Sequence, residues 1–158
     1  ADTVIVRAPP RWRMDDARRI LVPIGGRGDH SHLRARLLSS LSRSGDRSLT
    51  FLHVVGTATS ADERHRAERE MRRLARDEAA GPYEVQVDVT DAPVQAIIER
   101  AAGMDLVVLG LGRRERVHRP VGELARAIAR STDVPLVLIS RRPVRSLGGL
   151  SSTGFRLT

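Results

Sequence analysis

The chain contains no cysteine and no lysine, and only 3% of its 158 residues are aromatic. Without cysteine it has no disulfides, no thiolate metal sites and no cysteine nucleophile. Without lysine it has no Walker A phosphate-binding loop, which needs that side chain. Because aromatic residues are scarce, the core must be built from aliphatic side chains.

Long hydrophobic runs are missing as well. The sequence has no uninterrupted apolar run of about 18 residues, so it predicts no membrane-spanning helix. The opening residues, ADTVIVRAPPRW, are too polar for a signal peptide. They lack an initiator Met and lead into a Pro/Arg linker, as in a piece of a longer protein. The expected location is cytoplasmic, at the inner face of the membrane if the chain is part of such a larger protein.

The net charge is +8, and all 27 basic residues are arginine. This balance raises the alternative of a nucleic-acid-binding domain. The arginines are, however, spread through helical segments and interleaved with Asp and Glu, and aromatic side chains that could stack on bases are scarce. Nucleic-acid binding is therefore a remote alternative, and no nucleic-acid partner is expected.

Five short apolar runs alternate with segments of helical periodicity. Four runs are continuously apolar, as in parallel strands buried on both faces, whereas YEVQVDV alternates and predicts an edge strand with one wet face. Strands are expected at 19–24, 48–55, 83–89, 105–111 and 135–140, and helices at about 31–43, 61–80, 92–102 and 122–132. This order predicts an α/β fold, a Rossmann-like doubly wound five-stranded parallel sheet with helices on both faces.

Composition divides the chain into three parts. The predicted α/β domain covers residues 19–140. Residues 1–18 are an N-terminal extension or linker, in which TVIVR is a candidate for an additional short strand. Residues 141–158 are a Gly/Ser-rich C-terminal tail.

Two local predictions concern the helices. Leu33, Leu37, Leu38 and Leu41 mark one face of the first helix, which is expected to be its buried face. Asp91 precedes the third helix and is expected to be its N-cap.

No catalytic residue and no metal site are predicted. His30 and His32 lie two residues apart in a turn, where a metal would need further ligands, and a solvated helix start explains them better. His53 lies inside an apolar strand and is expected to be a hydrogen-bonded core histidine. The acidic residues of the loops have no spacing that ties them into an active site, so the chain is not expected to be an enzyme.

Two glycine-containing segments follow expected strands. GGRGDHSH, at 25–32, follows the first strand and is only part of a dinucleotide-binding pattern. GLGRRERVHRPVGEL, at 110–124, joins the fourth strand to the last helix. Glycines at a strand end and at a helix start are typical of phosphate-binding loops, but Glu123 stands where an anion would sit. In a doubly wound sheet these two loops lie side by side, where the strand order reverses.

The segments RRILVPIGG, LTFLHVV and AAGMDLVVLGLG…VGELARAIARSTDVPLVLIS resemble the universal stress protein family, in order and spacing, over roughly residues 18–140. The resemblance implies a regulatory or sensor domain, an adenine-nucleotide site and a homodimer formed through the strand at 135–140. Such domains are also found as cytoplasmic C-terminal parts of amino-acid permeases and cation/proton antiporters, so attachment to or contact with a membrane transporter is one expected mode of action. By resemblance, the nucleotide site comprises Pro23, Ile24, Gly25, Gly26, Val54, Gly110, Gly112, Arg113, Arg114, Gly122, Glu123 and Leu124.

Three departures from the family pattern affect this nucleotide site. Nucleotide-binding members carry G-x2-G-x9-G-[ST], whereas this chain has Gly110-x-Gly112-x9-Gly122 followed by Glu123, and Gly25 replaces an acidic residue. Losing the hydroxyl costs about 0.5–1.5 kcal/mol, and a carboxylate about 4 Å from a phosphate costs roughly 1–4 kcal/mol. Together these effects lower the affinity by about ten- to several-thousand-fold.

The favoured interpretation is therefore a degenerate site that binds ATP weakly or not at all, with no certain cofactor. The alternative is a functional ATP- or AMP-binding protein in which Arg113 and Arg114 replace the lost phosphate contacts.

Overall fold

The computed structural model describes residues 3–25, 32–43, 46–110 and 123–140. The strands are β1 (Thr3–Arg7), β2 (Arg19–Ile24), β3 (Ser48–Val55), β4 (Tyr83–Val89), β5 (Leu106–Gly110) and β6 (Leu136–Ser140). The helices are α1 (His32–Ser42), α2 (Ala61–Glu78), α3 (Pro93–Ala101) and α4 (Glu123–Ser131), with a short 3-10 helix η1 (Met14–Asp16) after β1. The expected helices and strands are therefore present, and their bounds agree to within about two residues.

The strands form one six-stranded sheet in the order β1-β6-β5-β2-β3-β4. Strands β2 to β6 run parallel, so the doubly wound α/β architecture is confirmed. The sheet has six strands rather than the five expected, because TVIVR, the candidate for an additional strand, forms β1 and pairs antiparallel with β6. This β-branched segment covers a strand edge that would otherwise be open. β4 is the opposite edge of the sheet, as its alternating sequence predicted.

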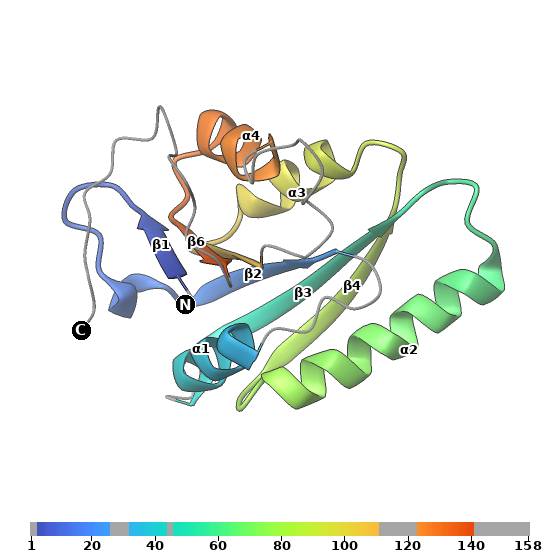
Figure 1. Ribbon diagram of the computed structural model, residues 1–158, viewed down its shortest axis with the longest axis horizontal. Coiled ribbons are helices and arrows are strands. Elements are labelled where there is room, and N and C mark those ends of the chain that lie inside the picture. The colour runs from blue at the N-terminus through green and yellow to red at the C-terminus, as the bar shows by residue number, and fades with distance from the viewer. Residues whose placement is uncertain (1–2, 26–31, 44–45, 111–122, 141–158) are drawn as a thin grey trace.

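Helices cover both faces of the sheet (Figure 1). On the α1/α2 face, a core cluster includes Phe51, Leu38 and Met71. On the α3/α4 face, a second cluster includes Leu52 and Ile128. Successive strand residues such as Phe51 and Leu52 belong to different clusters, because neighbouring side chains of a strand point to opposite faces.

The strand order reverses between β2 and β5. From β2 the chain continues outward to β3 and β4, and β5 and β6 then lie on the other side of β2. Because β2 and β5 are parallel neighbours, their carboxyl ends lie at the same edge of the sheet, where ligands bind in this type of fold. The loops that follow these strands, at 26–31 and 111–122, lie outside the described residues.

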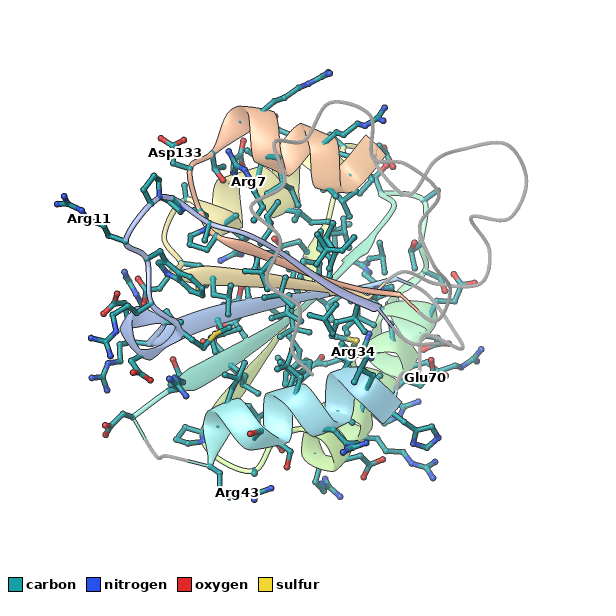
Figure 2. The ribbon with its side chains drawn as sticks, turned by 60° about the vertical axis from the view of Figure 1, so that its left-hand side comes forward. Arg7, Arg11, Arg34, Arg43, Glu70 and Asp133 are labelled. Carbon is teal, nitrogen blue, oxygen red and sulfur yellow. The ribbon has the colours of Figure 1, made fainter. Side chains whose placement is uncertain are left out.

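A buried ion pair joins α1 to α2. Nε and Nη2 of Arg34 donate to the two carboxylate oxygens of Glu78, each at 2.8 Å. The side chains are only 0% and 5% exposed. Figure 2 shows Arg34 between α1 and the rest of the molecule. The α1/α2 face thus contains a bidentate charge pair that the periodicity of apolar residues did not predict.

The buried side of α1 differs from the side expected from the sequence, because it includes Arg34. Leu38 and Leu41 are buried as expected, and Arg34 is buried with them. Leu33 and Leu37 are only half-buried at the margin of the cluster. The prediction for these two leucines is corrected accordingly: the inner stripe of α1 runs through Arg34, whose charge is met by a carboxylate.

α2 and α3 begin differently. At the start of α2, the Ser60 hydroxyl accepts a hydrogen bond from the Glu63 N–H, and the Glu63 carboxylate accepts one from the Ser60 N–H. This is a capping box. The N-cap of α3 is Ala92, whose side chain makes no capping hydrogen bond. The prediction that Asp91 caps α3 is therefore wrong, because that carboxylate binds Thr57 instead.

Candidate functional site

The end of β2 carries three of the predicted site residues. Pro23 and Ile24 are buried, and Gly25 is exposed. The register between β2 and β5 ends at Leu21 and Val107, although both strands continue further. Proline has no N–H to donate to a ladder, so Pro23 suits a segment of β2 whose pairing is with β3 alone. The β2–β5 ladder thus stops before the strand ends at which the site is expected.

His53 of β3 lies beside the last residue of β2. It is in register with Ile24, and its Nδ1 lies 3.0 Å from the Ile24 carbonyl oxygen. Because a carbonyl oxygen only accepts, Nδ1 is the donor in this contact. The expected hydrogen bond of this histidine is confirmed, although its ring is half-buried rather than fully buried. The contact holds the backbone in place where β2 leads into Gly25.

Other predicted site residues come from β3, β5 and α4. Val54, near the end of β3, and Leu124, in the first turn of α4, are half-buried and pack against the α3/α4 cluster. Gly110 is the last residue of β5 and is in register with Ile139 of β6. Glu123 is the first residue of α4. The remaining predicted residues lie outside the described part of the chain: Gly26, Gly112, Arg113, Arg114 and Gly122.

A contact that the sequence did not predict lies at the same edge of the sheet. Asp91 accepts hydrogen bonds from the backbone N–H of Thr57 at 2.9 Å and from its hydroxyl at 2.5 Å. The bond from the hydroxyl, followed by the bond from the N–H, lowers the pKa of Asp91, so this carboxyl group is ionised at neutral pH. At Gly56, an added Cβ would lie 3.2 Å from the Asp91 carboxylate. The loop after β3 is therefore tied closely to the loop after β4.

A shallow depression of about 400 Å³ lies elsewhere, between α2 and the edge strand β4. It is lined by Ala61, Arg64, His65, Glu68, Val87 and Val89. None of these is a predicted site residue, and β3 separates β4 from β2 in the sheet. The depression is therefore distinct from the predicted nucleotide site.

The described residues contain neither a cluster of metal-binding side chains nor a helix that could cross a membrane. No group of three or more His, Asp or Glu side chains in these residues is placed to hold a metal ion. Within the same ranges, no helix has both the length and the apolar character needed to cross a membrane.

A model of the universal stress protein family matches residues 17–140. The chain belongs to the universal stress protein family. The matched range begins after β1, so this strand lies outside the part that the family model describes. A search of curated proteins found no match.

Solved structures of other universal stress proteins and a hypothetical protein share the fold. The hypothetical protein MJ0577 aligns with a TM-score of 0.64 and 14% identity, over 80% of this chain and 97% of that one. UspA from Lactobacillus plantarum aligns with a TM-score of 0.61 and 19% identity, over 78% and 98%. The universal stress protein from Archaeoglobus fulgidus in complex with dAMP aligns with a TM-score of 0.55 and 17% identity, over 78% and 98%. At these identities the similarity establishes the fold.

Proposed function

We propose that this universal stress protein domain is a non-enzymatic regulatory or sensor domain with a degenerate adenine-nucleotide site, which binds ATP weakly or not at all. The observation that carries the proposal is Gly25. This exposed residue follows the last residue of β2, beside the point where the strand order reverses. A glycine there offers no carboxylate to the ribose or base of a nucleotide.

The ligand class is supported by one relative and by the fold. The Archaeoglobus fulgidus protein is solved in complex with dAMP. In this chain, the ends of β2, β3 and β5 meet at one edge, and the described site residues Pro23, Val54 and Gly110 come from these strands. An adenine nucleotide is therefore the ligand class to test first.

The start of α4 supports weak rather than tight binding. Glu123 is its first residue. A helix N-terminus carries about half a positive charge and attracts anions. A carboxylate at the first helical position is attracted by the same partial charge, so it competes with a phosphate instead of assisting its binding.

Calorimetric titration of the full chain with ATP, ADP and AMP in the presence of Mg²⁺ tests the proposal. Three variants are compared with the unaltered chain: Gly25→Asp, Glu123→Ser and the double variant. The matched control is Glu70→Ser, which removes a carboxylate from the exposed surface of α2 (Figure 2). The unaltered chain and the control are expected to bind with a dissociation constant above about 1 mM. The double variant should bind at least about tenfold more tightly, since it regains a hydrogen bond and loses a repulsive charge.

Two outcomes contradict a degenerate site. Micromolar binding by the unaltered chain supports the alternative of a functional ATP- or AMP-binding protein, and loss of that binding in Arg113→Ala and Arg114→Ala would establish it. If the double variant binds no better than Glu70→Ser, then Gly25 and Glu123 are not what weakens the site.

The domain is proposed to act through dimerisation or as the cytoplasmic regulatory part of a transporter. A dimer through the strand at 135–140 would use β6, which has β5 on one side and β1 on the other. Such a dimer therefore requires β1 to leave that edge. Attachment to a transporter, a position at the inner face of the membrane, and the roles of residues 1–18 and 141–158 stay predictions from the sequence. Binding to random-sequence DNA that weakens steeply with salt would instead favour the remote nucleic-acid alternative.

A further inference from the structure

β1 is held to the molecule mainly through its neighbour β6. Its five residues pair antiparallel with that strand. Ile5 packs against the α3/α4 cluster, to which β6 contributes. Arg7 Nη1 donates to the carbonyl oxygen of Thr132 at 3.2 Å, a few residues before β6. A β1 strand from any copy of the chain could make these same contacts, because β6 and the residues close to it provide them.

The other face of β1 adds little burial. Val4 and Val6 are 40% and 41% exposed, whereas their partners in β6, Ile139 and Val137, are 2% and 1% exposed. The described residues of the α1/α2 layer therefore bury β6 but leave β1 at its margin. A five-residue edge strand with two exposed valines is attached less firmly than the inner strands.

The chain that follows β1 consists of an exposed hinge and an anchored segment. Residues 8–11 are all exposed. Beyond them, Trp12 and Met14 pack against the α1/α2 cluster. Arg47 donates to the carbonyl oxygens of Met14 and Ala17 at 3.1 and 2.9 Å. If β1 separates from β6, residues 8–11 can change conformation while the segment from Trp12 onward keeps its contacts.

This hinge is folded into a strained tight turn. The Trp12 N–H donates to the Pro9 carbonyl oxygen at 3.2 Å, which places Pro10 and Arg11 at the two central positions. Arg11 has a φ of 69°, the only positive φ at a non-glycine residue in the described parts of the chain. A turn with proline second and a positive φ third is of type II, in which glycine suits the third position. An arginine there is strained, and both prolines favour an extended chain once the turn opens.

We propose that β1 is exchanged between two copies of this chain, so that the β1 of each copy pairs with the β6 of the other. The β1–β6 ladder, the packing of Ile5 and the Arg7–Thr132 hydrogen bond re-form between the copies. Only residues 8–11 change, from a strained turn to an extended connection. Short hinges under strain favour such exchange, because the dimer keeps the contacts of the monomer and releases the strain. The interaction surface is thus the β6 edge, and the partner is a second copy.

Exchange of β1 does not depend on nucleotide binding. The exchanged dimer uses the edge of β6 without leaving any strand of the sheet unpaired. It also gives a role to residues 3–11, which precede the range that the family model matches.

Cross-linking between two copies gives a direct test. The chain has no cysteine, so Val6→Cys and Val137→Cys can be made as separate single-cysteine proteins. These two positions are directly opposite each other in the β1–β6 ladder, where Cα atoms lie about 4.5–5.5 Å apart and a disulfide fits. The two full-length proteins, one of them isotopically labelled, are unfolded together, refolded as a mixture and oxidised. Exchange is expected to yield a mixed disulfide dimer, identified by its mass.

The matched control replaces the Val137→Cys protein with Arg36→Cys, at an exposed position of α1, whereas β1 pairs with β6. This mixture should give far less mixed dimer. Absence of a Val6–Val137 cross-link, or cross-links between two Val6→Cys copies alone, would overturn the proposal. The second result would place the outer edges of two β1 strands side by side instead.

Light scattering of the cysteine-free chain over a range of concentrations gives a second, independent test. Arg11→Gly removes the strain from the closed turn, so its dimer should dissociate more readily, with a dissociation constant raised at least about tenfold. Arg13→Gly is the matched control, because it removes the same charge from a residue with φ −121°. A chain that stays monomeric after refolding at every concentration would contradict exchange. A dimer that is equally stable with and without Arg11→Gly would contradict the role of the hinge.

Discussion

The two faces of the sheet are buried in different ways. On the α3/α4 face, hydrophobic side chains such as Leu21, Ile128 and Leu138 form the cluster. On the α1/α2 face, Arg34 and Glu78 are buried beside hydrophobic residues, and they are the only buried charged residues among those described. Both layers exclude water, but only one of them contains charges that must be matched.

This difference determines how each face responds to mutation. A hydrophobic residue stabilises the fold through the area and the contacts that it buries. Its removal therefore lowers the free energy of unfolding by about the contribution of those contacts. A buried ion pair stabilises little compared with apolar residues of similar size, but removing one partner leaves the other charge buried without it. The α1/α2 face is therefore more sensitive to a single change of charge, and the α3/α4 face to a loss of volume.

The largest effect is expected when the buried pair is broken. Glu78→Gln removes the carboxylate that Arg34 binds and should lower the free energy of unfolding by about 3–5 kcal/mol, measured by urea denaturation. The matched control is Glu68→Gln, at the exposed i,i+4 pair with Arg72, where little change is expected. The double variant Arg34→Met/Glu78→Met should recover most of the loss. If Glu78→Gln lowers the free energy of unfolding no more than Glu68→Gln does, the contrast between the two faces does not hold.

A smaller but still large effect is expected on the opposite face. Ile128 is 0% exposed, and Ile128→Ala should lower the free energy of unfolding by about 3 kcal/mol, because it leaves a cavity under α4. Ile128→Val should cost only about 1 kcal/mol. Arg130→Ala, at an exposed position of the same helix, serves as the control in the same urea experiment. Equal losses for the alanine and valine variants at position 128 would show that volume is not what this face depends on.

The smallest of the three effects concerns Asp105, whose carboxylate joins the start of β2 to the start of β5. Asp105 accepts hydrogen bonds from the N–H groups of Arg18 and Arg19 at 3.1 and 2.8 Å, and Arg19 Nη2 lies 3.0 Å from its other oxygen. Burial raises the pKa of Asp105, but the hydrogen bonds from Arg19 and Arg18 outweigh this and leave the pKa below its ordinary value. The carboxylate therefore stabilises the fold above the unfolded pKa of about 3.9, and this contribution is lost as the pH falls through the folded pKa.

Asp105→Asn should accordingly lower the free energy of unfolding by about 1 kcal/mol at pH 7. Its stability should also fall less steeply than that of the unaltered chain below about pH 4. Denaturation curves recorded from pH 7 to pH 2 measure both effects. Asp46→Asn is the control, because Asp46 pairs with Arg18 at 3.0 Å but is 72% exposed. Parallel pH profiles for the Asp105 variant and the unaltered chain would show that this carboxylate does not contribute through its ionised form.

Much of the fold could be predicted because it depends on local patterns. The alternation of YEVQVDV identified the edge strand, and continuous apolar runs identified the inner strands. The place expected for the candidate site follows from a related pattern: β2 and β5 are parallel neighbours at the point where the strand order reverses, so their carboxyl ends lie at one edge of the sheet. What occupies that site stays a prediction, since it depends on Gly25 and Glu123 rather than on the strand pattern.

The interactions that were missed join residues far apart in the sequence. Glu78 follows Arg34 by 44 residues, and both occupy inner stripes of their helices, Arg34 with Leu38 and Glu78 with Leu74. A charged residue on the apolar stripe of each helix indicates that the two charges need partners. It does not show that the two stripes face each other. Asp91 could equally have been a helix cap, and only the position of the loop after β3 directs it elsewhere.

The amino-acid sequence by itself determined the helices and strands and the parallel order of the central sheet, because hydrophobic periodicity and chain connectivity are local properties of the chain; the family followed from the resemblance of three of its segments. The tertiary structure alone decided that TVIVR pairs with β6, that Arg34 meets Glu78 and that Asp91 binds Thr57. Each of these depends on which surfaces lie together after the chain has collapsed. A buried charge or an open strand edge has to find a partner, and that partner is set by packing in space rather than by distance along the chain.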